Sequence, residues 1–168
     1  MISNSDFIKK ILFKGIKHTP TKGQLQLIDK LSSFVFCQDK HPLFVILGYA
    51  GTGKTSVVSS LVKALPYANM NSVLLAPTGR AAKVLAEYSG NKAYTIHKYI
   101  YFVNSSPERG FSIQIRPNKH KNTIFVVDEA SMISDSDSNI YKNSNLLNDL
   151  INFVFQGNNC RLILCGDT

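Results

Sequence analysis

A glycine-rich run that ends in lysine and threonine carries the clearest chemistry in this sequence. Residues 48–55 read Gly-Tyr-Ala-Gly-Thr-Gly-Lys-Thr and fit the pattern G-x-x-x-x-G-K-[ST] of a phosphate-binding loop. The glycines let the backbone turn its N–H groups inward around phosphate oxygens, and Lys54 is expected to reach the β and γ phosphates of ATP. The residues that we expect to contact ATP here are Gly48, Tyr49, Ala50, Gly51, Thr52, Gly53, Lys54, Thr55 and Ser56.

A pair of adjacent carboxylates follows another apolar run. Residues 124–127 are Ile-Phe-Val-Val, and Asp128 and Glu129 come directly after them. Such a pair also occurs in ordinary turns and helix starts, but beside a phosphate-binding loop it favours catalysis. We expect Asp128 and the Thr55 hydroxyl to hold Mg²⁺, and Glu129 to orient and deprotonate the attacking water. These roles imply that ATP is hydrolysed rather than only bound.

A third acidic group stands near the end of the chain. The apolar residues 162–165 are followed by Gly166, Asp167 and Thr168. Asp167 is interpreted either as a sensor of the γ-phosphate or as a plain cap or turn residue. The predicted catalytic residues are Lys54, Asp128, Glu129 and Asp167, and the predicted metal ligands are Thr55 and Asp128.

Short apolar runs and helical patterns alternate along the chain and would position these groups. Runs with the length and branching of strands buried on both faces are 43–47, 73–76, 123–127 and 161–165. Helical patterns cover 21–37, 54–65, 79–88 and 145–155. The alternation predicts an α/β fold with a mostly parallel sheet flanked by helices, whose ligands lie at the carboxyl ends of the strands.

Three further segments are interpreted from their local pattern. Residues 99–103 and 111–115 predict the two strands of a protruding β-hairpin, which forms an insertion over 98–118. Residues 1–18 interleave lysines with apolar residues and predict a short amphipathic helix. The Ser-, Asn- and Asp-rich stretch 134–145 predicts a mobile surface loop.

The composition favours one globular domain that binds polyanions. The chain has 168 residues, 44% hydrophobic and 18% charged, and lacks an apolar run that could cross a membrane. Cys37, Cys160 and Cys165 lack pairwise metal spacing, and two of them lie in apolar stretches, so we expect a reducing cytoplasm. The formal net charge of +8 favours nucleic acid, although a merely solvated basic surface would carry the same charge.

Further motifs make the chain resemble superfamily 1B helicases of the RecD, Dda and Pif1 kind, from about residue 21 to 168. They are Ala-Pro-Thr-Gly-Arg-Ala-Ala at 76–82, Thr-Ile-His at 95–97 and Gly-Asp-Thr at 166–168, in addition to Asp-Glu-Ala-Ser at 128–131. The resemblance implies one RecA-like P-loop ATPase domain over 1–168, with ATP and Mg²⁺ as ligands. It also implies an ATP-dependent motor that acts on single-stranded DNA, in DNA repair or recombination.

The resemblance assigns residues to the DNA groove. In this family the stretch around Pro77, Thr78 and Arg80, and that around Thr95 and His97, lie where single-stranded DNA crosses the domain. A phosphate site at Thr78 has a physical reason, because the residue stands between a strand and a helix N-terminus. Two alternatives stay open: Thr78 is only a helix N-cap, and His97 is only a structural histidine.

The resemblance also bears on adenine and on the hairpin. Gln24 looks like the adenine-reading glutamine of the family, and an exposed glutamine on an ordinary helix is the alternative. A hairpin at this position acts in the family as a wedge or strand guide. The aromatics Tyr99, Tyr101, Phe102 and Phe111 would then either stack on bases or hold the hairpin to the core.

The resemblance stops at residue 168, where the family continues into a Gln-Leu-Pro run and a second motor domain. That domain carries arginines that complete the ATP site, and such an arginine accelerates hydrolysis by a factor on the order of 10³ or more. We therefore expect a truncated motor domain with weak hydrolysis and no translocation on its own. We expect no membrane partner and no small-molecule substrate other than ATP.

Two alternative functions remain open at this point. One is a non-motor ATPase switch, in which ATP alters the affinity for nucleic acid without directional movement. The other is a P-loop kinase, which is less favoured because the pair Asp128 and Glu129 suits the activation of water. A GTPase is disfavoured because Asn-Lys-His-Lys at 118–121 lacks the acid of the guanine-reading motif.

Overall fold

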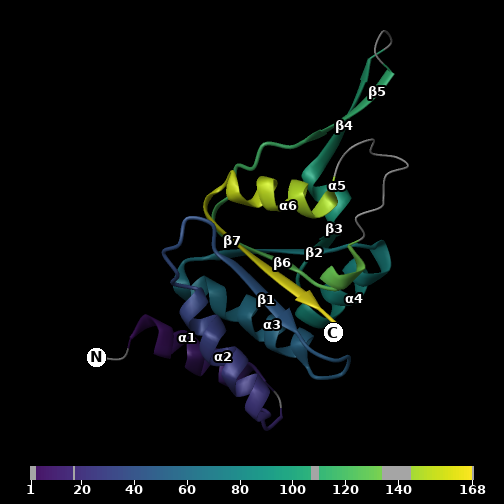
Figure 1. The fold of residues 1–168 in the computed structure, drawn as a ribbon. Helices are drawn as coiled ribbons and strands as arrows, with labels where there is room; N and C mark the ends of the chain where they lie inside the picture. Colours follow the sequence, from purple (N-terminus) through teal and green to yellow (C-terminus); the bar gives the residue numbers. More distant parts are fainter. Residues whose placement is uncertain (1–2, 17, 107–109, 134–144, 168) are drawn as a thin grey trace.

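Five parallel strands form the central sheet (Figure 1). The computed structural model describes residues 3–16, 18–106, 110–133 and 145–167. The strand order is β1-β7-β6-β2-β3, and every pairing of neighbours is parallel. The strands are β1 (Leu43–Leu47), β2 (Asn71–Ala76), β3 (Ala93–Thr95), β6 (Lys121–Val127) and β7 (Asn158–Gly166).

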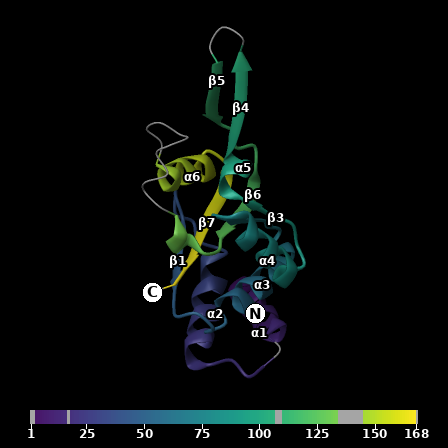
Figure 2. The ribbon, with the colours of Figure 1, turned by 90° about the vertical axis from the view of Figure 1, so that its right-hand side faces the viewer.

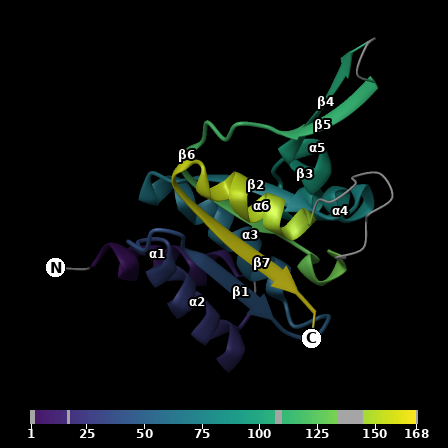
Figure 3. The same cartoon turned by 45° about the horizontal axis from the view of Figure 1, so that its top comes forward.

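Helices cover both faces of the sheet (Figure 3). One face carries α1 (Asn4–Gly15), α2 (Lys22–Phe34), α3 (Lys54–Ala64) and α4 (Gly79–Ser89). The other face carries α5 (Ile96–Ile100) and α6 (Leu146–Phe155). Two short 3₁₀ helices, η1 (Leu65–Ala68) and η2 (Ala130–Met132), complete the described helices. The α/β fold class predicted from the sequence is confirmed.

Strand β6 lies at the centre of this packing. Ile124 and Val126 belong to the core shared with α1, α2 and α3, whereas Phe125 and Val127 belong to the core shared with α5 and α6. All four side chains are fully buried. Alternating side chains of one strand therefore fill both cores, as expected of a strand covered on both faces.

Side-chain caps fix where the helices begin. The hydroxyl of Thr21 accepts a hydrogen bond from the backbone N–H of Gln24, and the Gln24 side chain accepts one from the Thr21 N–H. The hydroxyls of Thr78 and Thr95 cap α4 and α5 by accepting hydrogen bonds from the backbone N–H groups of Ala81 and Lys98, at 3.2 and 3.3 Å. Since Thr78 lies two residues after the end of β2 and Thr95 is the last residue of β3, the caps also fix the helices relative to the sheet.

The strand predictions are confirmed in position but not always in burial. Strands β2, β6 and β7 begin two or three residues earlier than predicted. The prediction that 43–47 is buried on both faces is wrong, because β1 is an edge strand. Leu43, Val45 and Leu47 are 45%, 51% and 63% exposed. An apolar run by itself does not tell an edge strand from a central one.

A two-stranded antiparallel hairpin projects from the body of the molecule (Figure 2). It consists of β4 (Tyr101–Ser106) and β5 (Gly110–Ile115) and confirms the predicted insertion. The prediction that its first strand starts at Tyr99 is wrong, because Tyr99 and Ile100 end helix α5. Residues 107–109 of its turn lie outside the described residues, as do residues 134–144 of the predicted mobile loop.

Other predictions from composition and pattern can be compared with the structure. The N-terminal amphipathic helix is confirmed as α1, whose Ile8 and Leu12 are buried. Cys37, Cys160 and Cys165 are free thiols, and the latter two are buried. Across the described ranges, each helix is too short or too polar to span a bilayer.

Tyr101→Phe tests how the hairpin base is fastened to the body. The Tyr101 hydroxyl donates a hydrogen bond of 2.7 Å to Oδ2 of Asp149 on α6, and the side chain is only 7% exposed. Removing a donor to a part-buried carboxylate should lower the free energy of unfolding by about 1.5–3 kcal/mol. Tyr88→Phe, at a residue that is 68% exposed, is the control and should change it by less than about 0.5 kcal/mol. Urea unfolding measures both, and equal stability would contradict the assigned role.

Candidate functional site

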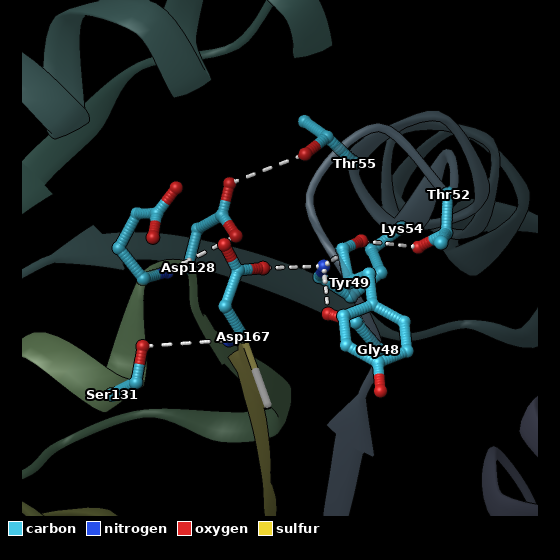
Figure 4. Close-up of polar contacts among 9 residues, drawn as sticks. Gly48, Tyr49, Thr52, Lys54, Thr55, Asp128, Ser131 and Asp167 are labelled. Atoms are coloured by element: carbon cyan, nitrogen blue, oxygen red, sulfur yellow. Dashed lines mark hydrogen bonds and ion pairs between the residues drawn. The ribbon is translucent and has the colours of Figure 1, made fainter.

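The side chains predicted to act on ATP gather at one edge of the sheet (Figure 4). Because all five strands are parallel, their carboxyl ends lie at the same edge. The glycine-rich loop follows β1, Asp128 follows β6, and Asp167 follows β7. Strand β7 pairs with both β1 and β6, so three segments that are distant in the sequence meet around one site.

The glycine-rich loop adopts backbone angles that favour glycine. Gly51 and Gly53 have φ values of +77° and +81°, in the left-handed region. Gly53 is also the N-cap of α3, and a Cβ there would lie 2.4 Å from Nε2 of Gln24. The first turn of α3 therefore starts at the loop, with its unpaired N–H groups and the positive end of its dipole toward it. This arrangement suits phosphate oxygens.

The ammonium group of Lys54 is held by three oxygens. Its Nζ donates to the carbonyl oxygens of Gly48 and Tyr49, at 2.6 and 3.0 Å. It also forms an ion pair of 2.6 Å with Oδ1 of Asp167, and the lysine side chain is only 13% exposed. A phosphate group that binds Lys54 must displace Asp167 or share the ammonium with it. Asp167 is thus an ion-pair partner of the loop lysine, and its role as a sensor of the γ-phosphate stays a prediction.

Asp128 and Glu129 are carboxylates in an environment that disfavours their charge. Asp128 accepts a hydrogen bond of 3.1 Å from the N–H of Glu129, and its Oδ2 lies 3.5 Å from the hydroxyl of Thr55. Burial nevertheless raises the pKa of Asp128 above its ordinary value. The pKa of Glu129 is also raised, first by burial and then by the negative charges of Asp128 and Asp167.

The turn after β6 brings a further residue to the site. Glu129 has a φ of +54°, a backbone conformation that costs roughly 1–3 kcal/mol in residues other than glycine. It precedes η2, whose Ser131 hydroxyl accepts a hydrogen bond of 3.4 Å from the Asp167 N–H. A Cβ on Gly166 would lie 3.3 Å from the Ser131 nitrogen, so the two turns approach closely. Ser131 had no predicted role, although its place in the Asp-Glu-Ala-Ser motif was a usable signal.

The donors at Thr55 and Asp128 fit a magnesium ion. A hydroxyl and a carboxylate are oxygen ligands, which Mg²⁺ prefers, and the two oxygens face each other at 3.5 Å. Within the part of the chain that the structure describes, no three His, Cys, Asp or Glu side chains form a metal cluster. Magnesium that also binds phosphate oxygens and water needs only one or two protein ligands, so this donor set is sufficient.

A cavity of about 270 Å³ adjoins the loop and is lined by residues of α2 and β1. Gln24 lies in its wall and is 7% exposed, which does not fit the alternative of an exposed glutamine on an ordinary helix. Its Nε2 donates a hydrogen bond of 2.9 Å to the Thr52 carbonyl, and its Oε1 accepts from the Thr21 N–H. The amide thus ties the start of α2 to the phosphate loop. A contact between Gln24 and adenine stays a prediction.

The residues predicted to bind DNA lie beside this site, at the ends of β2 and β3. The two strands are neighbours, which brings Pro77 and Thr78 close to Thr95. Thr78 and Arg80 are exposed, whereas Pro77, Thr95 and His97 are half-buried. The capping role that was the alternative for Thr78 is present in the structure, and it leaves the residue at a helix N-terminus where a phosphate can also bind.

Two of the four aromatics predicted for the hairpin, Tyr99 and Tyr101, pack against the body. Tyr101 is buried, and its ring centroid lies 5.8 Å from that of His97. Tyr99 packs edge-on against Phe125, with ring centroids 6.3 Å apart. These contacts agree with the alternative that such aromatics hold the hairpin to the core. The side chain of Phe111 lies outside the described residues.

Comparisons with known proteins show which family the chain belongs to. A family model described as an AAA domain matches residues 21–168. The ATP-dependent RecD2 DNA helicase of Deinococcus radiodurans is 28% identical over 149 residues, which cover 89% of this chain and 19% of that protein. The ATP-dependent DNA helicase dda of Enterobacteria phage T4 is 33% identical over 115 residues, which cover 67% of this chain and 26% of that protein.

A third relative is an uncharacterised protein of Acanthamoeba polyphaga mimivirus. It is 32% identical over 141 residues, and the match covers 68% of this chain and 27% of that protein. The chain therefore spans less than a third of the length of each of these three relatives. The matches therefore say nothing about the parts of these relatives that lie outside the aligned residues.

Asp128→Asn is expected to stabilise the nucleotide-free protein at neutral pH. A carboxyl group whose pKa is raised by folding opposes folding once it is ionised, and the amide has the same shape without the charge. The melting temperature at pH 7 should rise by roughly 2–4 °C. The gain should shrink as the pH falls through the raised pKa of Asp128, because the carboxyl group is then protonated.

Scanning calorimetry measures this shift, with Glu87→Gln on the exposed face of α4 as the control. The control removes an exposed charge and should leave the melting temperature within about 1 °C. An Asp128→Asn protein that melts at or below the parent temperature at pH 7 would show that the carboxylate is not destabilising.

Proposed function

The chain belongs to the AAA domain family, in the form found in superfamily 1B helicases such as RecD2 and Dda, and from this premise we propose that it is an ATP-hydrolysing motor domain. A P-loop domain of this family implies that ATP is bound. The names of two relatives state that those proteins are ATP-dependent DNA helicases. For this chain, the magnesium ion, the single-stranded DNA and the movement along it are part of the proposal.

The observation that carries the proposal is the meeting of Lys54, Asp128 and Asp167 at the carboxyl edge of the sheet. Lys54 and Asp167 are in contact at 2.6 Å, and Asp128 faces the P-loop through Thr55. A purely structural ion pair would not need a glycine-rich loop, a helix N-terminus and two further acids around it. The set is what a magnesium triphosphate requires.

The residues have separate roles in the proposed reaction. The loop N–H groups and Lys54 bind the β and γ phosphates, and Glu129 accepts a proton from the attacking water. The water oxygen bonds to the γ-phosphorus while the bond to the β–γ bridging oxygen breaks. Magnesium, when bound at Thr55 and Asp128, neutralises negative charge on the phosphates. Asp167 gives up its contact with Lys54 when phosphate arrives, which makes it a sensor of the γ-phosphate.

The DNA side of the proposal rests on position and charge. Arg80 is exposed in the first turn of α4, two residues after the cap residue Thr78. Thr95 begins α5 at the end of the neighbouring strand. With a net charge of +8, the chain favours a polyanion, and helix N-termini bind phosphates well. A single strand that crosses these two helix starts would lie next to the nucleotide.

Slow turnover is expected from these 168 residues alone. Among the described residues of the site, Lys54 is the cation proposed to bind the γ-phosphate. The carboxylate of Asp167 partly neutralises the charge of its ammonium group. An arginine supplied by a second motor domain would raise the rate by a factor on the order of 10³ or more. We propose that such a domain completes the site and the DNA cleft.

Glu129→Gln should bind ATP like the parent but lose the residual hydrolysis by at least about a hundredfold, because the general base is gone. Lys54→Ala is the companion variant and should lose ATP binding in calorimetry while it keeps the fold. Hydrolysis that survives in Glu129→Gln would identify another base. ATP binding that survives in Lys54→Ala would refute the nucleotide site. An ATP-dependent change in DNA affinity, without turnover in the parent, would instead support a non-motor switch.

Arg80→Glu should weaken the binding of fluorescent oligo-dT roughly tenfold and flatten its dependence on salt. The reason is that a cation which binds a phosphate at the start of α4 is replaced by an anion. Lys63→Glu makes the same charge change at the far end of α3 and is the matched control. Fluorescence anisotropy between 50 and 200 mM salt, a range in which about six to ten phosphate contacts have a large effect, measures both. If both variants lost the same amount of affinity for oligo-dT, the loss would be explained by net charge alone, and Arg80 would not be a DNA contact.

A further inference from the structure

A second cavity lies at the base of the hairpin, away from the P-loop. It has a volume of about 560 Å³, within the range of about 300–1,000 Å³ of small-ligand sites. We call it the hairpin-base pocket, and the residues of its wall that matter here are Tyr94, Lys98, Tyr99, Arg116, Lys119 and His120. They come from β3, α5 and the segment that joins β5 to β6. None of them belongs to the ATP site.

The floor of the pocket is aromatic and uncharged. The hydroxyl of Tyr99 lies 2.8 Å from Nε2 of His120, and the two rings are nearly parallel, at 25°. Tyr94 packs on Tyr99 with ring centroids 5.3 Å apart, and all three side chains are half-buried. Burial lowers the pKa of His120, and it raises the pKa of Tyr99 together with a smaller effect of Tyr94. Both groups are therefore neutral at pH 7 and can exchange hydrogen bonds with a polar ring.

The rim of the pocket is cationic. Lys98, Arg116 and Lys119 are all exposed, and among the described residues that line the pocket none is acidic. Arg116 is fixed in place, because its Nε donates to the Tyr101 carbonyl and its backbone N–H donates to the Ile100 carbonyl, both at 2.7 Å. Three positive charges around a neutral floor attract phosphate groups.

The segment that carries Lys119 and His120 is also held in place. The side-chain Nδ2 of Asn118 donates to the carbonyl oxygens of Phe153 and Val154, at 2.9 and 3.1 Å, at the end of α6. Figure 3 shows this segment returning from β5 past α6 to the start of β6. The backbone of this part of the wall is therefore fastened to α6.

A neutral aromatic floor below a cationic rim is complementary to a nucleotide. The base would stack on the rings, and the phosphates would contact the lysines and the arginine. A duplex does not fit, because both faces of its bases are already stacked. We propose that the hairpin-base pocket binds one unpaired nucleotide of the single-stranded DNA. Tyr94 supplies the ring for the base, and Lys98 and Lys119 hold the flanking phosphates.

The position of the pocket supports the proposal that its nucleotide belongs to the DNA strand of the predicted groove. Tyr94 and Lys98 directly flank the segment 95–97 that carries two of the predicted DNA contacts. Because Tyr94 is the residue before Thr95, the pocket begins next to the start of α5 that the strand is proposed to cross. The inference rests on the proposed DNA function and adds a base-binding subsite to it. It also explains Tyr94, Arg116 and His120, which no motif in the sequence singled out.

Tyr94→Leu, with Tyr94→Phe as the conservative variant, tests the base contact. We expect Tyr94→Leu to weaken the binding of oligo-dT about tenfold, because a base loses its stacking partner, and Tyr94→Phe to restore the binding. Against an abasic oligonucleotide of equal length, all three proteins should bind alike. A loss of equal size for both oligonucleotides, or no loss for either, would overturn the base-binding role of the pocket. Circular dichroism and thermal melting of each variant confirm that the fold is intact.

The double change Lys98→Glu and Lys119→Glu tests the rim, with Lys63→Glu and Lys14→Glu combined as the control of equal charge. We expect the rim variant to bind oligo-dT more than tenfold more weakly, and the slope of log affinity against log salt to fall by about 0.7 for each phosphate that the protein no longer neutralises. The control should lose less than threefold, and ATP affinity should not change in either protein. Equal losses in the two proteins would overturn the pocket.

The outcomes separate this inference from the proposed function. If the pocket variants bind oligo-dT like the parent while Arg80→Glu loses affinity, the pocket is refuted and the DNA-binding motor domain stands. If the parent shows no salt-sensitive binding of oligo-dT at all, the proposed DNA function fails and the pocket fails with it. Displacement of oligo-dT by free thymidine monophosphate from the parent but not from Tyr94→Leu would support the pocket directly.

Discussion

The parallel direction of all five strands is the constraint on which the rest of the structure depends. It puts the carboxyl ends of β1, β7 and β6, which carry the nucleotide residues, at the same edge as those of β2 and β3. In an antiparallel sheet of the same strand order, Asp167 at the end of β7 would lie at the edge opposite to the P-loop and Asp128. The parallel arrangement needs cover on both faces, because its crossover connections are helices. The two separate cores meet this requirement, and β6 contributes side chains to both.

The nucleotide site stores unfavourable electrostatics that a bound magnesium triphosphate would relieve. Three carboxylates stand around one ammonium. Burial raises the pKa values of Asp128 and Glu129, and the charge of Asp167 raises both further. Lys54 is held in place by Asp167 and two carbonyl oxygens, so its charge is oriented before any phosphate arrives. The positive φ of Glu129 adds backbone strain at the same point. The site therefore lowers the stability of the fold, and its groups are already positioned for binding.

Local patterns in the sequence were sufficient for the P-loop, for the carboxylates after β6 and for the strands that carry them, since each of these depends on a few neighbouring residues. They were not sufficient where the answer depends on the rest of the chain. Nothing in Leu43–Leu47 states that β1 lies at the edge, and its exposed side chains follow only from the strand order. The aromatic residue Tyr99 matches a strand pattern, but the Thr95 cap starts a short helix that contains it. The fastening of Gln24 to Thr52 joins residues 28 positions apart and has no local signal.

The same edge also provides a short connection between the nucleotide side and the DNA side. The backbone N–H of Asp128 donates a hydrogen bond of 3.0 Å to the carbonyl of Leu75 on β2. Three residues after Leu75 stands Thr78, the cap of α4, and β2 pairs in turn with the strand that leads to Thr95. On the other side of Asp128, the turn at Ser131 contacts Asp167, the residue that is proposed to release Lys54. If phosphate displaced Asp167 as proposed, the change would act on a turn that is bonded to the strand ending at the proposed DNA groove. The cores packed on both faces of the sheet restrict the movement of β6 and β2. A change at the nucleotide site would therefore move the ends of these strands rather than their middles.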